Sequence, residues 1–333
     1  MAEIRFKRLE ECGPEIFPKV EAAATESERT LYAVYGFKWF CWKFFENPHG
    51  MSYSWLALSE CEEVAGFVSF SPCSCRFGAE KIKAALSYET FVTPKFRRMG
   101  LFTKLCEKGM REAIQDGVVV MFNFPNDKSA SGFLKCGWND IGGSLIWIKP
   151  VNRFKFFTEL LKNKMRFGEF RQNNEVPIAG LDFEINVNDG YRPIYQTANK
   201  FLQTSKEKDY LRWRYAQHPV WKYDFFKTDA FLFIFKRGER DGLAEVQLLD
   251  IISICESPSA KDLKKGLREV LRIVSPDIIT AFSGDGFFPN NLLAKTGFIH
   301  RPSRGNFYIY EPSGTKFIER NIWSTTGGDY HMY

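Results

Sequence analysis

The sequence predicts a mixed α/β protein built from two related units in tandem, the second a degenerate copy of the first. Three observations support this fold class. The chain has 333 residues, which is long for one hydrophobic core. The first half alternates strand-like and helix-like patterns in an order that gives a mixed sheet with helices on both faces. Short motifs of the first half return in the second half.

The first predicted elements are antiparallel strands and one aromatic helix. "IRFKRL" (4–9) is a short strand, and the helix over 32–48 ends before Pro48, because a residue before proline resists the α region. Residues 54–72 alternate around a polar "ECEE" turn, which predicts a hairpin. Residues 83–94 form another strand, which Pro94 ends.

A strand–helix–strand unit follows. Apolar residues recur at helical spacing between Leu101 and Ile114, and Gly117 ends that helix. "VVVMFNF" (118–124) predicts a buried strand. "PNDKSASGFLKCGW" (125–138) predicts a loop, a short helix and a glycine exit.

The second half repeats parts of this pattern. "WKFFENP" at 42–48 returns as "WRYAQHP" at 213–219, and "FLKCGW" at 133–138 returns as "LLAKTGF" at 292–298. Between these motifs the pattern predicts a hairpin over 231–252, a helix over 259–274 and a strand over 277–284. We therefore place a first domain at 1–150 and a second at 180–333. Chance similarity is the alternative, because the matches are few.

A basic segment joins the two halves. Residues 149–171 carry seven Lys or Arg and two Glu. The segment has two interpretations, a helix that binds a membrane surface or nucleic acid, or an interdomain helix with a solvated basic side. We favour the second and assign 151–179 as a basic amphipathic linker helix. Its apolar residues could share one face: Phe154, Phe157, Leu160, Leu161 and Met165.

Composition excludes several classes of protein. The chain is 44% hydrophobic and 26% charged, as in soluble globular proteins, and its net charge of +6 is too small to indicate nucleic-acid binding. No apolar leader or membrane-length apolar run is found, so we expect a cytoplasmic protein. The eight cysteines form no CxxC pair and only four histidines accompany them, so we expect reduced thiols and no metal site.

The stretch "VTPKFRRMGLF" (92–102) predicts a phosphate-binding turn. A strand that ends at Pro94 and passes into a helix at Gly100 leaves the first N–H groups of that helix without partners. These donors and the positive helix end suit a diphosphate, and glycine lets the backbone approach it closely. Arg97 and Arg98 add charge. The alternative is an ordinary turn with basic residues on its surface.

The longer run "ETFVTPKFRRMGLFTKL" resembles the acyl-CoA signature of the GNAT acetyltransferase superfamily, Arg/Gln-x-x-Gly-x-Gly/Ala after a strand. Arg97 and Gly100 match its first two fixed positions, and Phe102 stands where Gly or Ala is usual. Asn126 and the pair Gly137–Trp138 match a second part of the family pattern. The repeat makes the layout similar to that of tandem GNAT proteins of bacteria.

The resemblance implies direct transfer of an acetyl group from acetyl-CoA to a primary amine, either a small molecule or an amino sugar. It implies a coenzyme site that comprises Phe91, Val92, Arg97, Arg98, Met99, Gly100, Leu101, Phe102, Thr103, Asn126 and Phe133. The strand at 89–92 would hold the pantetheine arm, and 97–103 the pyrophosphate.

The reaction also needs a base and an acid. We expect Glu89 to act as the base, directly or through water, with a solvated strand carboxylate as the alternative. Phe133 occupies the position where many family members have a tyrosine acid. Tyr88 or water would then protonate the leaving thiolate.

The second half lacks Arg-x-x-Gly at the corresponding turn, and Glu256 and Asp262 would repel a diphosphate there. We therefore expect it to supply a wall of the acceptor pocket rather than a second CoA site. Alternatively it only stabilises the first half. The residues we expect at the acceptor are Trp213, Tyr215, Phe287, Phe288, Trp323 and Asp329.

Two other functions remain open at this point. A Fem-like transferase that uses aminoacyl-tRNA fits a tandem fold and a basic surface, but the CoA turn argues against it. A non-catalytic CoA-binding or partner-binding module fits the missing tyrosine. For the favoured function we expect a small-molecule partner, no nucleic acid, and a membrane surface only as a less favoured contact.

Overall fold

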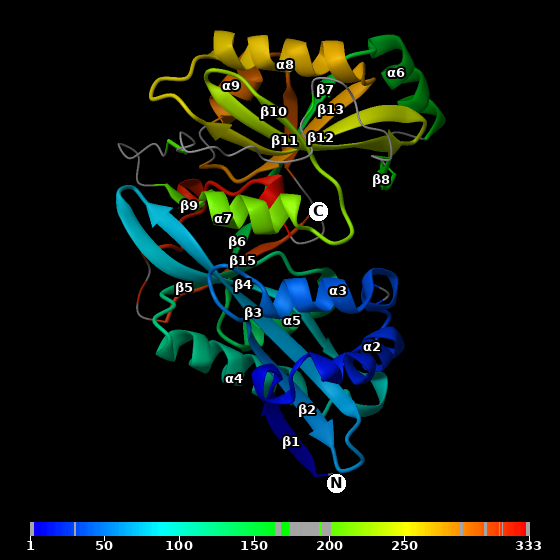
Figure 1. The fold of residues 1–333 in the computed structure, drawn as a ribbon, viewed down its shortest axis with the longest axis vertical. Helices are drawn as coiled ribbons and strands as arrows, with labels where there is room; N and C mark the ends of the chain where they lie inside the picture. Colours follow the sequence, from blue (N-terminus) through cyan, green and yellow to red (C-terminus); the bar gives the residue numbers. More distant parts are fainter. Residues whose placement is uncertain are drawn as a thin grey trace.

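The computed structural model describes residues 3–29, 31–163, 168–173, 181, 193–194, 201–286, 289–302, 305–312, 314 and 316–330. Two mixed β-sheets follow one another along the long axis of the molecule (Figure 1). The C-terminal end of the described chain, up to Tyr330, runs between the two sheets. The predicted mixed α/β fold class is therefore confirmed.

The first sheet has the strand order β1-β2-β3-β4-β5-β15-β6, and β9 pairs with the far end of β3. All of its neighbouring strands are antiparallel except β4 and β5, which run parallel. The strands are β1 (Ile4–Arg8), β2 (Tyr53–Ser59), β3 (Val64–Phe77), β4 (Glu80–Val92), β5 (Val120–Asn123), β15 (Phe307–Tyr310), β6 (Asn139–Gly142) and β9 (Leu202–Thr204).

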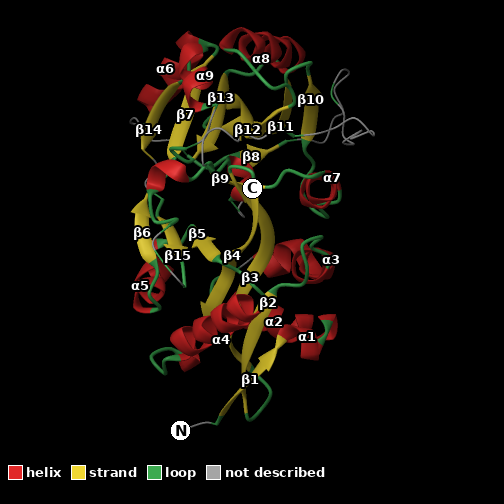
Figure 2. Cartoon of the chain, turned by 90° about the vertical axis from the view of Figure 1, so that its left-hand side faces the viewer, coloured by secondary structure: helices red, strands yellow, loops and turns green. Residues whose placement is uncertain are grey.

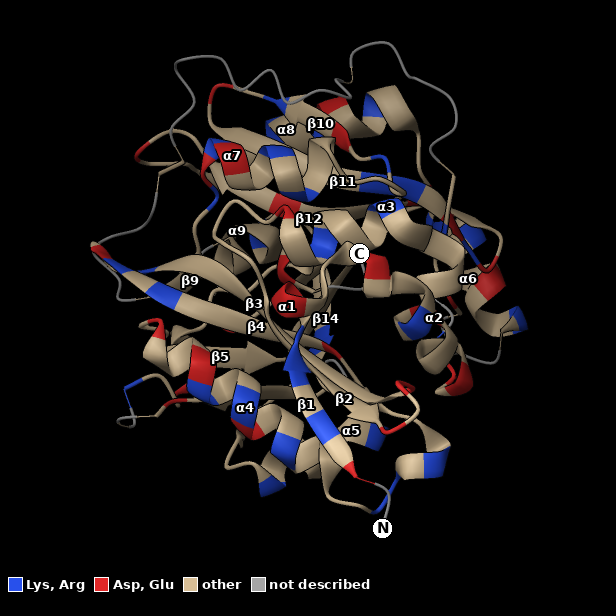
Figure 3. Cartoon of the chain, turned by 60° about the horizontal axis from the view of Figure 1, so that its bottom comes forward, with Lys and Arg blue, Asp and Glu red and all other residues tan. Residues whose placement is uncertain are grey.

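Helices cover both faces of the first sheet. Helices α1 (Leu9–Cys12), α2 (Phe17–Glu26) and α3 (Leu31–Phe45) lie on one side, and α4 (Leu101–Gln115) and α5 (Asp127–Lys135) on the other (Figure 2). The buried residues of helix α4 recur every three or four positions and so form one face: Leu101, Leu105, Cys106, Gly109, Met110 and Ala113. Its outer face carries both basic and acidic residues (Figure 3).

The second sheet has the order β10-β11-β12-β13-β7-β14, and β8 pairs with β11. Helices α6 (Arg153–Lys162), α8 (Ala260–Val274) and α9 (Asn290–Lys295) lie on its outer side, and α7 (Lys208–Leu211) lies on the side of the first sheet (Figure 1). The strands are β10 (Asp224–Lys227), β11 (Phe231–Arg240), β12 (Leu243–Ser253), β13 (Ile278–Ser283), β7 (Leu145–Pro150), β14 (Ile299–Pro302) and β8 (Arg171–Gln172).

The first sheet contains two strands from the second half of the chain, β9 and β15, and the second sheet contains one strand from the first half, β7. Strand β7 belongs to the predicted first domain in sequence but lies between β13 and β14 of the second sheet. Strand β15 comes from the second half and lies between β5 and β6 of the first sheet. The exchange crosses residue 150, where the sequence places the end of the first domain. The two units are therefore joined by hydrogen-bonded sheet as well as by side-chain packing.

The repeated Trp motifs meet at the interface between the units. The rings of Trp42 and Trp213 stack with centroids 4.7 Å apart. Each indole N–H donates to the other residue's carbonyl, at 2.9 and 3.1 Å. The second repeated motif also has matching geometry, because Gly137 after α5 and Gly297 after α9 both have positive φ, 82° and 90°.

A shared core fills the space between the two sheets. Phe67 of β3 and Phe122 of β5 belong to the same cluster of buried side chains as Ile234 of β11 and Leu249 of β12. The face of the second sheet that packs here is opposite the face that α8 covers. Burial of this kind on both sheets is typical of an obligate contact between units.

The linker helix differs from the prediction. Phe156 is its buried aromatic residue, whereas Phe154, Phe157 and Leu161 are exposed, at 84%, 57% and 70%. Leu160 is partly buried against the cluster that contains Ile148 and Phe156, and Met165 lies outside the described residues. The predicted shared apolar face therefore packs only in part. None of the described helices combines the length and apolarity needed to cross a membrane.

Candidate active site

Strands β4 and β5 separate from each other halfway along β4. Their parallel pairing runs from Ala84 and Val120 to Leu86 and Phe122 and then ends. Strand β4 continues to Val92, paired only with β3 on its other side. The separation leaves main-chain groups of β4 available at the carboxyl edge of the sheet, where ligands commonly bind in α/β proteins.

A β-bulge in β4 lies at this opening. The register between β3 and β4 shifts between Phe67 and Ser69, and Glu89 of the bulge has a φ of 50°. A non-glycine residue with positive φ is uncommon, and a bulge re-aims its side chain. Glu89 points to the side of α3, where its Oε1 accepts a hydrogen bond from Lys43 Nζ at 2.9 Å.

The pair Lys43–Glu89 is almost fully buried, with side-chain exposures of 4% and 7%. Burial lowers the pKa of Lys43, and the neighbouring charge of Glu89 opposes that shift. The second carboxylate oxygen, Glu89 Oε2, is buried without a hydrogen-bond partner among the described residues. A charged oxygen in this condition is expensive unless a ligand or water satisfies it.

Two further buried hydroxyls on the separated part of β4 lack partners in the described structure, Ser87 Oγ and Thr90 Oγ1. The carbonyl of Thr90 accepts from Arg29 at 3.2 Å. Unsatisfied polar atoms are rare in protein interiors. Their concentration on the separated part of β4 fits a segment that binds a polar chain, as a pantetheine arm would require.

The turn before α4 has the geometry predicted for an anion site. Gly100 has a φ of 72°, and a Cβ added there would have no atom within 4 Å. No side chain caps α4, and the amides of residues 98–103 donate no hydrogen bond within the described chain. Arg97 and Arg98 are exposed beside them. The free donors and the open glycine together suit a phosphate group.

Helix α5 begins at the same edge of the sheet as α4, because each follows one of the two parallel strands. Asn126 is exposed and caps α5, since its side chain accepts from Ser129 N at 3.1 Å. Phe133 is 1% exposed, and its ring lies 5.2 Å from that of Phe102. Asn126 is therefore placed at the opening, whereas Phe133 lies in the core between α4 and α5.

Tyr88, the predicted acid, is buried on the side of α3. Its ring stacks on Phe44 at 5.8 Å, and its hydroxyl donates to the carbonyl of Lys43 at 3.1 Å. Burial raises its pKa above the usual tyrosine range. Another tyrosine, Tyr32, lies close to Glu89, and its pKa is raised first by burial and then by that carboxylate. The sequence contains no motif that would have identified Tyr32.

In the second unit two parallel strands also separate, but another segment of the chain fills the gap between them. The parallel pairing of β12 and β13 ends at Leu248 and Ala281, and the chain at 323–329 lies beside the continuation of β13. Gly284 N donates to Thr325 O at 2.8 Å, and Gly286 N donates to Trp323 O at 3.0 Å. The C-terminal segment therefore occupies the position that corresponds to the opening in the first unit.

The helix that follows β12 is also closed to anions. Helix α8 carries a complete capping box, in which Ser259 Oγ accepts from Asp262 N at 3.2 Å and the Asp262 carboxylate accepts from Ser259 N at 3.0 Å. The side-chain and main-chain hydrogen bonds from Ser259 lower the pKa of Asp262. A negative charge and a satisfied first turn replace the free donors of α4.

Most of the residues that we predicted to contact the acceptor are buried in the interface. Trp213, Tyr215, Trp323 and Asp329 are each 5% exposed or less. Their polar groups bind other parts of the protein: Asp329 accepts from Thr204 at 2.6 Å and from Lys206 at 2.9 Å, and the Tyr215 hydroxyl donates to Asp250. Phe287 and Phe288 lie outside the described residues.

A cavity of about 410 Å³ lies beside these buried residues, between α3 and the second sheet. It is lined by Tyr35, Trp39, Trp42, Lys43, Gly168, Glu169, Phe170, Gln172, Arg214, His218, Trp221, Lys236 and Arg240. Lys43 connects this cavity to the bulge, because its ammonium group binds Glu89. No sequence motif identified Lys43, Arg214 or Lys236, which come from three separate elements.

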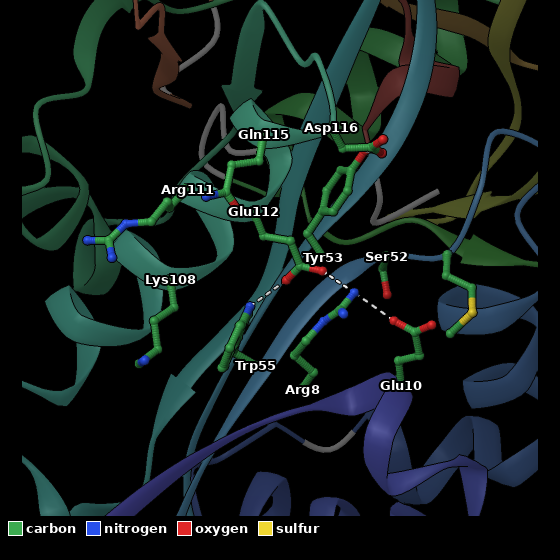
Figure 4. Close-up of a pocket in the computed structure, with 11 residues that line it drawn as sticks. Arg8, Glu10, Ser52, Tyr53, Trp55, Lys108, Arg111, Glu112, Gln115 and Asp116 are labelled. Atoms are coloured by element: carbon green, nitrogen blue, oxygen red, sulfur yellow. Dashed lines mark hydrogen bonds and ion pairs between the residues drawn. The ribbon is translucent and has the colours of Figure 1, made fainter.

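A larger cavity of about 690 Å³ lies between β2 and the C-terminal half of α4 (Figure 4). Several of its polar groups are paired with each other: Trp55 Nε1 donates to Glu112 at 2.6 Å, and Tyr53 Oη donates to Asp116 at 2.5 Å. It lies away from the bulge and from the open turn. We therefore regard this cavity as a surface hollow rather than as the reaction site.

The described residues contain no group of three or more His, Cys, Asp or Glu that could hold a metal ion. All eight cysteines are free thiols. The geometry therefore concentrates the candidate chemistry at the separated strands, the open turn and the cavity reached through Lys43.

Comparison with known proteins agrees with this geometry. Residues 14–138 match the model of the acetyltransferase (GNAT) family. A search of curated protein sequences gave no match. Among solved structures, a GCN5-related N-acetyltransferase from Kribbella flavida has a TM-score of 0.59 at 10% identity, over 93% of this chain and 71% of that one.

Two further structures have a similar fold. N-myristoyltransferase of Saccharomyces cerevisiae with bound myristoyl-CoA has a TM-score of 0.55 at 12% identity, over 97% of this chain and 84% of that one. A GCN5-related N-acetyltransferase from Anabaena variabilis has a TM-score of 0.54 at 14% identity, over 92% and 72%. The chain therefore has a GNAT-like fold, and its residues 14–138 resemble a domain of the acetyltransferase (GNAT) family.

Proposed function

We propose that this protein is an N-acetyltransferase that moves an acetyl group from acetyl-CoA to a primary amine of a small molecule. One observation carries the proposal: the separated, bulged part of β4 leads directly to a helix start with unpaired amides and an open glycine. The first feature offers main-chain groups to a pantetheine arm and the second offers donors to a pyrophosphate. The two lie in the order along the chain that acyl-CoA requires.

In this proposal the amides of 98–103, with Arg97 and Arg98, hold the pyrophosphate. The continuation of β4 from Ser87 to Val92 holds the pantetheine arm and aligns the thioester with the bulge. Asn126 contributes at the other side of the opening. We do not assign Phe133 to the coenzyme, because Phe102 and the core cover it.

Several observations favour a short acyl group. Tyr32, Phe44 and Phe67 lie on the α3 side of the sheet near the bulge, and all three are fully buried. Phe91 is 5% exposed and contacts both Tyr32 and Phe67. The yeast structure that shares the fold holds myristoyl-CoA. Here aromatic rings fill the space next to the bulge, so an acetyl group fits the proposal better than a long chain.

The reaction needs one proton removed and one supplied. The amine nitrogen attacks the thioester carbonyl, the N–C bond forms and the C–S bond breaks, and the electron pair leaves on the CoA sulfur. Glu89 Oε2, unpartnered and at the bulge, takes the proton from the nitrogen directly or through water. Tyr88 donates to a carbonyl, so we propose that water supplies the proton to the thiolate.

The second unit takes no coenzyme in this proposal, because the segment 323–329 and the capping box of α8 occupy the two corresponding positions. We propose that it is a degenerate GNAT-like unit that supplies the C-terminal wall of the acceptor cavity. A degenerate copy of a CoA-binding fold accounts for the matching strand order in the two sheets.

Calorimetric titration with acetyl-CoA tests this proposal. Gly100→Val should abolish measurable binding, because valine at positive φ shifts the turn and places a branched side chain beside the phosphate. The matched control is Gly117→Val at the other end of α4. Gly117 has a φ of 82° and equally open surroundings, so this variant carries the same backbone strain, about 1–2 kcal/mol, away from the site.

Unchanged affinity in a folded Gly100→Val protein would contradict the proposed site. Titrations of the wild type with CoA and with tRNA separate the other functions. Binding of tRNA and no binding of acetyl-CoA would indicate an aminoacyl-tRNA transferase. Acetyl-CoA binding with no turnover of any amine would indicate a binding module.

Initial-rate kinetics test direct transfer. No cysteine lies at the bulge in the described structure, so we expect both substrates to be bound together and the double-reciprocal lines to intersect. Parallel lines with a trapped acetyl-cysteine would contradict a ternary complex.

A further inference from the structure

We propose that the cavity of about 410 Å³ between the two units binds an anionic group, a carboxylate or a phosphate, carried by the amine that accepts the acyl group. The identification of the ligand as the acyl acceptor rests on the proposed function. The anion site itself depends only on the residues that line the cavity. In this proposal, residues of α3 and of the second unit determine specificity for the acceptor, away from the turn before α4.

Cationic side chains outnumber acidic ones on the wall of the cavity. Four cationic side chains line it and Glu169 is the acidic residue among its described lining residues. Two of the cations have carboxylate partners, since Lys43 binds Glu89 and Arg240 binds Glu245 at 2.6 Å. Arg214 donates to Gly328 O at 3.2 Å and to Tyr223 Oη at 3.3 Å.

Lys236 is the residue on which the argument depends. It points inward from β11, is 3% exposed, and forms neither an ion pair nor a hydrogen bond in the described structure. Its ammonium group lies over the rings of Trp221 and Tyr223, 4.3 and 5.3 Å from their centroids. Aromatic faces offset only part of the cost of burying a charge. An anionic ligand would supply the missing partner.

The electrostatic surroundings of Lys236 support the same conclusion. Burial, and then the charge of Arg214, lowers its pKa to about 7. His218, on the same wall, has its pKa lowered to about 2, by burial first and then by Arg214, Lys236 and Lys43. The other charged or titratable groups that line the cavity are Tyr35, Glu169 and Arg240. Three cations close enough to repel one another would all be stabilised by one oxyanion.

The position of the cavity relates the anion to the reaction. Lys43 lies on its wall and donates to Glu89 at the bulge, so an amine held by its anionic group at Lys236 and Arg214 extends past Lys43 toward the thioester. The tryptophans and tyrosine on the wall would cover an apolar body between the two ends. A volume of about 410 Å³ suits a small molecule and not a polymer.

Matched probes test the inference without acetyl-CoA. Phenylacetate, phenyl phosphate and neutral benzyl alcohol share a ring and differ in charge, and tryptophan fluorescence reports binding near Trp39 and Trp221. We expect saturable binding of one or both anions and at least tenfold weaker binding of the alcohol, as for a charge-assisted contact. The stronger of the two anions distinguishes carboxylate from phosphate. Equal binding of all three probes would overturn the inference.

Lys236→Met should lower the affinity for the anionic probe by about tenfold or more and leave the affinity for acetyl-CoA unchanged. Lys108→Met is the matched control, because Lys108 also lies over a tryptophan, 4.9 Å from the ring of Trp55, in the other cavity. Equal effects of the two variants would overturn the site. Anion binding in a protein that does not bind acetyl-CoA would reject the proposed function and keep this site. Acetyl-CoA binding without a preference for the anionic probes would reject this site and keep the proposed function.

Discussion

At the residue scale, a single carboxylate connects the opening proposed for the coenzyme with the cavity proposed for the acceptor. Glu89 has a strained backbone, one oxygen bound by Lys43 and one oxygen without a partner. Strain and an unsatisfied buried charge both reduce stability, and proteins retain them mainly where function needs them. Lys43 holds one oxygen of the carboxylate in position, and in the proposed reaction the other oxygen receives the proton of the amine.

We expect Glu89→Gln to lower kcat by about 10²-fold, because the amide cannot accept the proton. The dissociation constant for acetyl-CoA should change by less than about threefold, since main-chain groups and the turn hold the coenzyme. Steady-state kinetics and calorimetry measure the two quantities. Glu112→Gln is the control, a part-buried carboxylate of the other cavity. Equal losses in kcat and affinity would assign Glu89 to coenzyme binding instead.

A second residue-scale prediction concerns pH. The pKa of Lys236 is about 7 in the folded protein against 10.5 ordinarily. The unfolded chain therefore keeps a proton that the folded protein releases between these values, and the destabilising effect of Lys236 is full below pH 7 and fades toward pH 10.5. Lys236→Met should raise Tm by more at pH 6 than at pH 9. A Tm difference that does not depend on pH would show that Lys236 is not buried in charged form.

At the element scale, the two strand–helix junctions show how much of the site the sequence predicts. The glycine and arginines before α4 predict its open start, and Ser259 with Asp262 predicts the closed start of α8. These are local signals, because a helix start depends on the few residues beside it. The bulge at Glu89 and the burial of Phe133 depend on distant strands and helices, so spacing alone could not predict them.

The C-terminal segment is an element that the sequence left ambiguous. "NIWSTTGGDY" has no helical or strand period, and its burial depends on partners far away in sequence. Lys206 binds Asp329 and Asp250 at 2.9 and 3.1 Å. Burial disfavours its charge, but the two carboxylates more than offset this and raise its pKa above the usual lysine range. The segment is thereby fixed to β12 and β9.

Gly328→Ala tests how closely this segment fits. A Cβ at Gly328 would lie far inside van der Waals contact with the Tyr215 hydroxyl and the Asp250 carboxylate. We expect a loss of about 2 kcal/mol or more in the free energy of unfolding, as for overpacking in a core. Gly314→Ala is the control, because its nearest neighbour would lie at 3.6 Å. Denaturant titration measures both, and equal stability of the two variants would contradict the tight fit.

At the scale of the whole molecule, the sequence predicted the positions of helices and strands better than it predicted which strands pair with each other. The hairpin of β2 and β3, helix α4, the hairpin of β11 and β12 and helix α8 all lie where periodicity placed them. Strands β7 and β15 could not be assigned to a sheet, because a short apolar run fits either sheet equally well. Their exchange is decided by tertiary contacts, and sequence patterns report local structure only.

The exchange makes the two halves depend on each other. A chain of residues 1–150 would lack β15 and expose the edges of β5 and β6, and it would carry β7 without β13 and β14. It would also expose its share of the core between the sheets, including Phe67 and Phe122. Exposed edges and an open apolar face both promote aggregation. Neither half has a complete sheet of its own.

We therefore expect the full chain to unfold in one cooperative transition, with calorimetric and van't Hoff enthalpies that agree. The isolated fragments 1–150 and 151–333 should not fold alone, and their co-expression should restore a complex that binds acetyl-CoA. Calorimetry on the full chain and circular dichroism on the fragments measure this. Two separate transitions, or a soluble fragment 1–150 with native acetyl-CoA affinity, would show that the exchanged strands are dispensable. The coenzyme unit would then be independent of the second half.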